Sequence, residues 1–370
     1  VRLYFRYKQV TCRTRGATPR DDSHTKVPKS TVHVTTASND SHTDGADPMS
    51  KPPRVISVLP SATEILCLVG GSDLLVGRSH EDNFPRNITH LPVLTGQKTT
   101  YTTAADVDAQ VSAALGSGQS LYTLDVETIR SLAPLDLILT QDLCAVCAID
   151  LATVERLAAD LEPRPVVLSL NPENVEDVLT DVLVVGAAVQ REAEATLAHA
   201  ALLARMAVVD EAVARVAPGP VTNVAFMEWP DPIYVGGHWT PQLIQRAGGA
   251  HPLNPATAAK GGGAGKSFAV PHEEFVASDP DLIIVCPCGL DLAMIRTEMD
   301  RLQGETWWRE LRAVRSGRVA MVDGDAMFNR PGPRLVDAFE WLASVFLERP
   351  ELAPSDFPVE WLESSLPPSS

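Results

Sequence analysis

The segment from Asn171 to Val216 constrains the fold of this chain more than any other. It opens on Asn171-Pro172-Glu173, which is typical of a helix start, with a capping side chain, a proline and a carboxylate near the positive end of the helix dipole. No further proline follows until Pro218. Gly186 predicts a bend, so we expect a shorter helix and then a longer one from Gln190 to Val216, which would span roughly 40 Å.

A helix of that length in the middle of the chain, with similar sequence patterns on either side, predicts a strut between two lobes. Its sequence from Gln190 onward consists almost entirely of good helix formers. The residues predicted to share one stripe of this helix are Ala193, Leu197, Ala201, Ala204 and Val208.

Strand and helix patterns alternate on both sides of this segment. The apolar stretches 136–140 and 281–285 are each preceded by a short helix and followed at once by cysteines. Such alternation predicts an α/β fold of two Rossmann-like lobes, whose parallel sheets carry helices on both faces and which are joined by a single long helix. The expected boundaries are a disordered tail at 1–52, a first lobe at 53–170, linking helices at 171–217, a second lobe at 218–348 and a C-terminal tail at 349–370.

The charge of the chain limits its partners. A formal net charge of -16 argues against a nucleic-acid partner and against attachment to anionic lipid. The apolar runs are too short to span a bilayer, and we find no apolar signal-peptide core. The first twenty residues are basic and faintly resemble a transit peptide, with a flexible tail as the alternative. We therefore expect a cytoplasmic or organellar protein rather than a periplasmic one, and a monomer.

Polar and aromatic residues follow the predicted strands. In open parallel sheets a ligand lies beyond the carboxyl ends of the strands, so two facing lobes would bring these residues to one cleft. The candidate ligand-binding residues are Pro60, Ser61, Arg78, His80, Glu81, Gln141, Cys144, Cys147, Glu228, Trp229, His238, Trp239, Cys286, Cys288, Phe328, Asn329 and Arg330.

Each group among these candidates also has a purely structural interpretation. The helix start at Pro60-Ser61 suits a carboxylate, an amide oxygen or a phosphate, or else the residues there simply cap their own helix. The turn at Arg78–Glu81 would contact a ligand, and His80 would bind a metal, or the turn is merely solvated. Trp229, His238 and Trp239 would make a flat wall for a large planar ligand, or else belong to the core.

The cysteines allow three interpretations. Cys144, Cys147, Cys286 and Cys288 form two close pairs, which would supply thiolates from both lobes to one metal, with His80 as a further candidate ligand. The Cys144–Cys147 pair would alternatively cycle as a dithiol. All four would otherwise be small buried residues that pack loops.

The loop 328–334 contains prolines that would hold Phe328 and Arg330 in a fixed direction for ligand contact, or it merely caps the last helix. The run Gly261–Ser267 looks like a phosphate loop, but Lys260 stands where the first glycine should be and no buried strand leads into it. We expect it to form a flexible lip of the cleft.

Several of these segments together resemble a known family. Val55–Ile65, the Pro280–Ile283 motif with its Leu135 variant, the central helix, Leu243–Gly249 and Asn329–Arg334 look like the cobalamin and iron-siderophore periplasmic binding proteins of ABC importers. The resemblance covers about residues 54 to 348. It is closest to the cobalamin-binding branch, which also carries elements similar to the run from Gln141 to Cys147 and to Cys286–Gly289.

The resemblance implies a class III periplasmic-binding-protein fold that holds a corrinoid between lobes with little domain closure. By position, Pro60-Ser61 would touch the side-chain amides of the corrin. Trp229 and the Trp239 loop would flank the ring, and Phe328 and Arg330 would contact the ligand from the second lobe. It also implies a membrane permease as partner if the protein is exported, and no required cofactor.

The leading hypothesis is non-catalytic binding of cobalamin or a related corrinoid. A first alternative keeps the binding role but changes the ligand to haem, a ferric chelate or a metal ion held by His80 and the cysteines. A second alternative is a chelatase-like or dithiol-dependent enzyme that acts on a tetrapyrrole.

Overall fold

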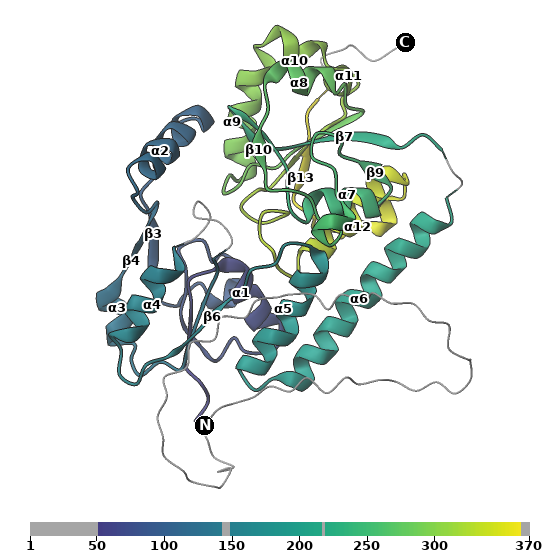
Figure 1. Cartoon of the computed structure of the whole chain (residues 1–370). Coiled ribbons are helices and arrows are strands. Elements are labelled where there is room, and N and C mark those ends of the chain that lie inside the picture. Colours follow the sequence, from purple (N-terminus) through teal and green to yellow (C-terminus); the bar gives the residue numbers. More distant parts are fainter. Residues whose placement is uncertain (1–50, 143–148, 217–218, 364–370) are drawn as a thin grey trace, which may run out of the picture.

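The computed structural model describes residues 51–142, 149–216 and 219–363. Two α/β lobes lie at the two ends of the molecule, with a long helix beside both of them (Figure 1). The α/β class expected from the sequence is therefore confirmed.

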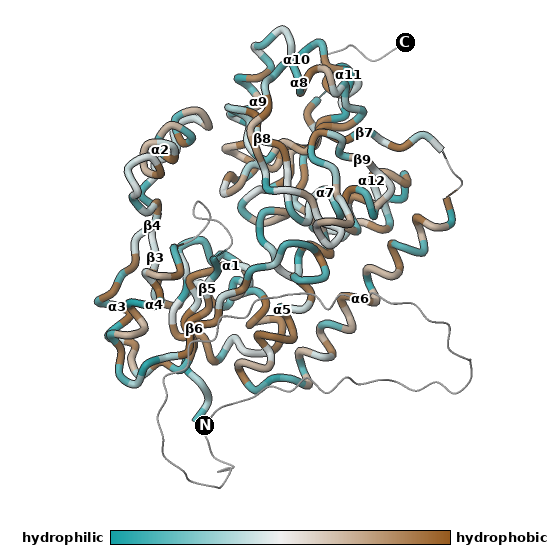
Figure 2. Tube along the Cα trace, in the orientation of Figure 1, coloured by the Kyte–Doolittle hydropathy of each residue, from teal (hydrophilic) through white to brown (hydrophobic). Residues whose placement is uncertain are grey.

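The first lobe is built on a four-stranded sheet in the order β2-β1-β5-β6, with all neighbouring strands parallel. Strands β5 and β6 of this sheet, together with helix α5, form a strongly apolar interior (Figure 2). The strands are β1 (Val55–Ser57), β2 (Leu75–Gly77), β5 (Leu137–Thr140) and β6 (Val166–Ser169). The helices are α1 (Pro60–Leu68), η1 (Arg86–Ile88), α3 (Val126–Ser131), α4 (Leu151–Ala159) and α5 (Val175–Ala188).

A separate arm leaves the first lobe between β2 and α3. It consists of β3 (Thr95–Gln97), α2 (Ala104–Gly116) and β4 (Tyr122–Leu124). Strands β3 and β4 pair only with each other, as an antiparallel ribbon. The ribbon carries α2 away from the first lobe and toward the second (Figure 1).

The second lobe has a seven-stranded mixed sheet in the order β10-β8-β7-β11-β12-β13, with β9 beside β7. Its centre is parallel, as predicted, but β8, β10 and β13 run antiparallel to their neighbours. The strands are β7 (Thr222–Pro230), β8 (Ile233–Val235), β9 (Gly249–Ala250), β10 (Phe268–Ala269), β11 (Leu282–Val285), β12 (Val319–Val322) and β13 (Val359–Trp361). The helices are α7 (Thr240–Arg246), η2 (Ala258–Lys260), α8 (His272–Ala277), α9 (Leu292–Gln303), α10 (Thr306–Glu310), α11 (Arg312–Arg315), α12 (Leu335–Phe346) and η3 (Pro350–Leu352).

The second lobe extends beyond the boundary expected at residue 348. Strand β13 pairs with β12, and Phe357 stacks on Trp341 of α12 with ring centroids 4.9 Å apart. Residues up to Leu362 therefore belong to this lobe. The alternation of valine and tryptophan in Val359–Trp361 is too short to have marked a strand.

The linking helices differ from the prediction in their start and in their break. Helix α5 begins at Val175, where the side chain of Asn174 accepts a hydrogen bond from the Asp177 amide, while Asn171 accepts instead from the Asp142 amide. Helix α5 also continues through Gly186. An ideal Cβ at Gly186 would lie 2.2 Å from the Cβ of Ala195, so this glycine allows close packing of two helices and does not bend one.

Helix α6 (Glu192–Ala214) is the predicted strut, but its buried face is not the one that carries the predicted stripe. Its buried residues are Ala195, Leu202, Met206, Val209 and Ala212, whereas the predicted stripe is exposed along its whole length, with Leu197 72% and Val208 59% accessible. Alanine and leucine occur on all sides of this helix, so apolar residues alone do not identify its inner face. Arg205 pairs with Asp337 and Glu340 of α12, which fixes the rotation of the helix.

Candidate ligand-binding cleft

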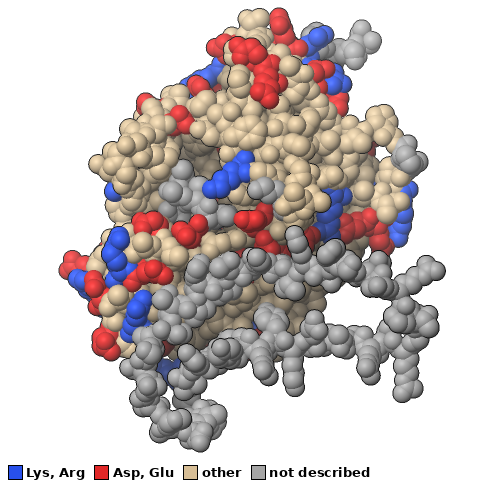
Figure 3. All heavy atoms as spheres, viewed as in Figure 1, with Lys and Arg blue, Asp and Glu red and all other residues tan. Residues whose placement is uncertain are grey.

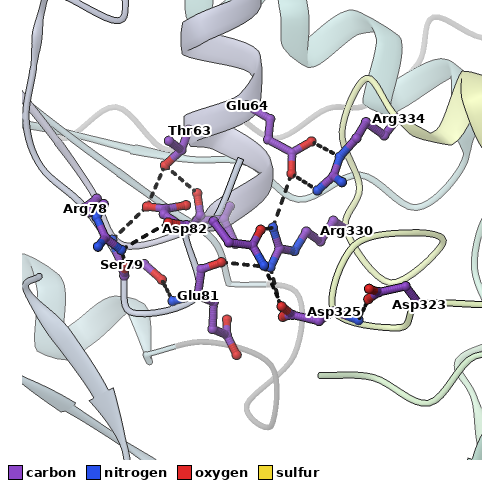
Figure 4. Close-up of polar contacts among 12 residues, drawn as sticks. Thr63, Glu64, Arg78, Ser79, Glu81, Asp82, Asp323, Asp325, Arg330 and Arg334 are labelled. Carbon is purple, nitrogen blue, oxygen red and sulfur yellow. Dashed lines mark hydrogen bonds and ion pairs between the residues drawn. The ribbon is translucent and has the colours of Figure 1, made fainter. Parts of the chain in front are cut away.

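Loops from the carboxyl ends of the two central sheets meet at the boundary between the lobes. The strongest contact joins α1 of the first lobe to the loop after β12 in the second. Glu64, with its side chain 3% exposed, lies 3.3 Å from Arg330 and accepts two hydrogen bonds from Arg334, at 2.9 and 2.5 Å. A buried carboxylate with two guanidinium partners holds the lobes together at this point (Figure 4).

Arg330 is the centre of this contact. It donates to the Glu81 carbonyl at 2.8 Å, to Asn83 Oδ1 at 2.9 Å and to Asp325 at 3.0 Å. Asn83 also donates to Asp325 at 2.6 Å. We call Glu64, Asn83, Asp325, Arg330 and Arg334 the interlobe clasp. Arg330 is 8% exposed, and its guanidinium serves the clasp, so the predicted contact with a ligand stays a prediction.

Arg78 also has a structural role that differs from the expected ligand contact. Its guanidinium donates to the carbonyls of Ser79, Asp82 and Thr89, at distances of 2.9 to 3.1 Å. Arg78 therefore stabilises the conformation of the loop after β2, to which it belongs (Figure 4). The sequence did not predict this structural role of Arg78, because a side-chain pattern does not show which main-chain carbonyls will accept hydrogen bonds.

Asp82 is a site residue that the sequence did not single out. It accepts from the Ser79 amide at 2.7 Å and from the Thr63 hydroxyl at 3.0 Å, while its Oδ1 has no partner among the described residues. Burial raises the pKa of Asp82 to about 7, against the opposing effect of these hydrogen bonds. The carboxyl links the loop after β2 to α1, and these two segments carry the clasp residues Asn83 and Glu64.

His80 lies on the same loop and is half-buried. Its Nδ1 is 2.7 Å from Thr95 Oγ1, and its ring lies 6.0 Å from that of Tyr122, so it rests against the base of the arm. Nε2 is buried without a hydrogen-bond partner in the described part of the chain. Burial lowers the pKa of His80, which favours the neutral imidazole. Beside it, burial raises the pKa of Glu81 despite the nearby Arg330.

The aromatic residues of the second lobe divide into a rim and a core. Trp229 is half-buried, and its Nε1 donates to Ala104 of the arm and to Asp231, both at 3.1 Å. Trp239 is 6% exposed and donates to the Phe328 carbonyl at 2.6 Å. Phe328 is 1% exposed and packs edge-on against Phe226 and Trp341. Trp239 and Phe328 are therefore core residues of the second lobe, which for Trp239 is the structural alternative given above.

The remaining candidates are placed as follows. Pro60 and Ser61 are buried under Gly332, whose ideal Cβ would lie 3.5 Å from Ser61, and no side chain caps α1. Asn329 donates to the carbonyls of Cys286 and Gly324, so it braces its own loop. The residues that stay half-buried or exposed near the boundary are His80, Glu81, Glu228, Trp229, His238 and Cys288, with Gln141 buried at the end of β5.

Cys144 and Cys147 lie outside the described residues, so the structure bears only on the Cys286 and Cys288 part of the cysteine hypotheses. Cys286 is fully buried, and burial raises the pKa of its thiol well above the usual value, whereas Cys288 is exposed. Within residues 51–142, 149–216 and 219–363, no group of three or more His, Cys, Asp or Glu side chains is arranged to hold a metal ion. The Cys286–Cys288 pair therefore does not present two equivalent thiolates.

The glycine-rich run after η2 packs onto the second-lobe rim. His238 exchanges backbone hydrogen bonds with Ala264 and Gly265, at 2.7 and 2.9 Å, and its ring stacks on Trp239. An ideal Cβ at Gly237 would lie 2.4 Å from the Ser267 amide, so only glycine permits this approach. These backbone bonds hold the run against His238, and its predicted role as a lip of the cleft stays a prediction.

The comparisons with known proteins place this architecture in a family. The chain belongs to the periplasmic binding protein family, whose model matches residues 55–326. Members of this family are non-enzymatic solute-binding proteins that deliver small ligands to the membrane permease of an ABC importer. The resemblance drawn from the sequence is confirmed at this level, and no curated protein sequence matches the chain.

Solved structures of similar fold have low sequence identity to this chain. A periplasmic haem binding protein from Pseudomonas aeruginosa is similar with a TM-score of 0.60 and 17% identity, covering 85% of this chain and 96% of that one. The periplasmic vitamin B12 binding protein of Vibrio cholerae gives 0.57 and 18%, covering 80% and 98%. A periplasmic haem-binding protein from Roseiflexus sp. RS-1 gives 0.58 and 20%, covering 82% and 100%.

The family corrects the expected location. Its members are periplasmic or otherwise extracytoplasmic, so the expectation of a cytoplasmic or organellar protein is wrong. That expectation depended on the first residues of the sequence, where no leader pattern was found. In the described ranges, no helix has the length and apolar character needed to cross a membrane.

Proposed function

We propose that this protein binds cobalamin or a related corrinoid between its lobes and presents it to a membrane permease. The observation that carries this choice of ligand is the use of the rim arginines. The two terminal nitrogens of Arg78 donate to main-chain carbonyls, although its buried Nε has no partner among the described residues, and Arg330 is held by the clasp. Haem needs cations for its propionate carboxylates, whereas the edge of a corrin bears mainly uncharged amides.

The other rim groups suit such a ligand. Trp229 and His238 supply flat ring surfaces from the second lobe, and His80 supplies an imidazole from the first. Glu81 and Glu228 would accept hydrogen bonds from corrin amides. Acidic side chains flank the boundary between the lobes in Figure 3, with basic side chains among them, so the boundary carries charges of both signs.

Haem remains a second candidate because of His80. When Nδ1 donates to Thr95, Nε2 keeps a lone pair, and this buried nitrogen has no partner among the described residues. A neutral imidazole oriented in this way is ready to ligate iron. The same atom would also ligate cobalt, so His80 alone does not distinguish the two tetrapyrroles.

Parallel titrations with hydroxocobalamin and haemin, followed by absorption spectra and thermal stability, test the proposal. We expect hydroxocobalamin to bind more tightly, and Trp229→Ala to weaken it about tenfold, as for an aromatic anchor. Trp361→Ala is the matched control, because Trp361 is a tryptophan of β13, 41% exposed, at the edge of the second sheet. Tighter binding of haemin, with a Soret shift that His80→Ala abolishes, would identify a haem carrier instead.

A further inference from the structure

The arm described above crosses the cleft and ends on the second lobe. We call residues 98–121, which lie between its two strands, the strap. The strap lies on one side of the molecule in Figure 1, and α6 lies on the other side. The chain therefore links the lobes covalently along α6, and the strap contacts the second lobe without a covalent connection at its far end.

A buried carboxylate of the second lobe holds the strap. Glu298 of α9 is 4% exposed and accepts hydrogen bonds from the Tyr101 hydroxyl at 2.6 Å and from the Ala104 amide at 3.0 Å. Burial, together with this hydrogen bond, raises the pKa of Tyr101 to about 12, so the hydroxyl remains a donor at neutral pH. Trp229 donates to the Ala104 carbonyl, which adds a contact from the opposite side.

The other contacts of the strap with the second lobe are fewer and more exposed. Arg301 donates to the Thr102 carbonyl at 3.4 Å, and Asp108 of α2 makes a hydrogen bond with Tyr234 of β8. Ala104 is the buried residue of α2, and Leu115 is 45% exposed. The β3–β4 ribbon joins neither large sheet, and an isolated two-stranded ribbon is marginally stable in water. Segments with few buried apolar contacts open at low free energy, and Glu298 is the buried carboxylate among the residues that hold the strap.

The contacts between the lobes are of a different kind. The clasp includes the side chains of Glu64 and Arg330, which are 3% and 8% exposed, and α6 packs along both lobes. Opening the lobes would leave a buried carboxylate and guanidinium groups without partners, which is costly. Opening the strap breaks fewer buried contacts, of which the packing of Tyr101 against the second-lobe core is one.

We propose that the strap is the moving part of this protein: it swings off Glu298 while the lobes stay clasped. The ribbon that carries the strap lies against His80 through Thr95 and Tyr122, and Ala104 of the strap accepts a hydrogen bond from Trp229. His80 and Trp229 are rim residues of the proposed cleft. Strap opening is therefore the route by which the ligand enters and leaves, a step of the inference that rests on the proposed function.

Hydrogen exchange followed by mass spectrometry tests this motion without any ligand. In Glu298→Ala we expect peptides covering Ala104–Gly116 to exchange at least about tenfold faster, while peptides covering Pro60–Leu68 keep the wild-type rate. Asp300→Asn is the matched control, since Asp300 is an exposed acid on the same helix. Tyr101→Phe removes the donor from the strap side and leaves the second lobe unchanged, so it should act in the same direction.

Two results would overturn the proposal: unchanged exchange of the strap in both variants, or α1 loosening together with the strap. Stopped-flow binding of hydroxocobalamin adds a second readout. Both the association and dissociation rates should rise in Tyr101→Phe, with a dissociation constant close to that of the wild type. If hydroxocobalamin does not bind, the proposed function fails, whereas the exchange rates still decide whether the strap moves.

Discussion

The guanidinium of Arg330 donates to four oxygen atoms, on Glu64, Glu81, Asn83 and Asp325. At the residue scale this matters for the cleft, because the charge of Arg330 is already balanced by Glu64 and Asp325 and so attracts an anionic ligand less. Trp239 shows the same principle among aromatic residues, since its indole N–H is occupied by a carbonyl within its own lobe.

Trp239→Ala tests the placement of this ring in the core. We expect the free energy of unfolding to fall by about 3–5 kcal/mol, because a buried aromatic side chain is removed and the Phe328 carbonyl loses its donor. Urea denaturation followed by far-ultraviolet circular dichroism measures the loss. The half-exposed Trp361, replaced in the same way, should cost much less, and equal losses would place Trp239 at the surface.

At the scale of elements, the pairing of α5 and α6 shows how one glycine sets the distance between two helices. Gly186 sits in the body of α5, and its bare Cα lets Ala195 of α6 approach. The two helices form a hairpin that begins in the first lobe, and α6 continues to α7 and α12 of the second lobe, where Asp210 pairs with Arg246. Close packing at the start of the hairpin therefore determines where the far end of α6 holds the second lobe.

Gly186→Ala is expected to destabilise the fold by about 1–3 kcal/mol, because the added methyl group would overlap Ala195 and force the helices apart. Gly116→Ala is the matched control, since that helical glycine has no neighbour within 4 Å of an ideal Cβ. Thermal unfolding of both variants gives the comparison. A stabilised Gly186→Ala protein would mean that α5 and α6 are not in tight contact.

At the scale of the whole molecule, the lobes are held by contacts at several separate places. The clasp joins α1 to the loop before α12, and α5 adds a hydrogen bond from the Val175 amide to Gln242. A further link joins Glu176 to Gln242 and Arg246. Because these contacts lie far apart, hinge opening would have to break them together, which agrees with the little domain closure implied by the family resemblance.

Glu64→Ala should weaken this arrangement strongly. Arg330 and Arg334 would each lose a buried carboxylate, so we expect a loss of about 3–5 kcal/mol in stability. Chemical denaturation measures the loss, and small-angle scattering measures whether the lobes separate. Glu310→Ala, on an exposed position of α10, should change neither quantity. Wild-type stability in Glu64→Ala would show that the clasp does not hold the lobes.

The sequence was most informative about strands and least informative about which side chains face the cleft. The apolar runs that became β5 and β11 alternate with helices, and this pattern is local. The fate of Phe328 depends on Phe226 and Trp341, which are distant in the chain, so no local pattern identified it as a core residue. The same holds for Asp82, whose partner Thr63 lies on another element.

The short strand at the end of the chain has a consequence for handling the protein. Val359–Trp361 occupies the outer side of β12 and covers backbone groups that would otherwise face solvent. A chain shortened to Glu348 would expose an unpaired strand edge, and such edges recruit strands from other molecules. Fusion partners and affinity tags therefore belong after Glu363, where they leave the pairing of β13 with β12 intact.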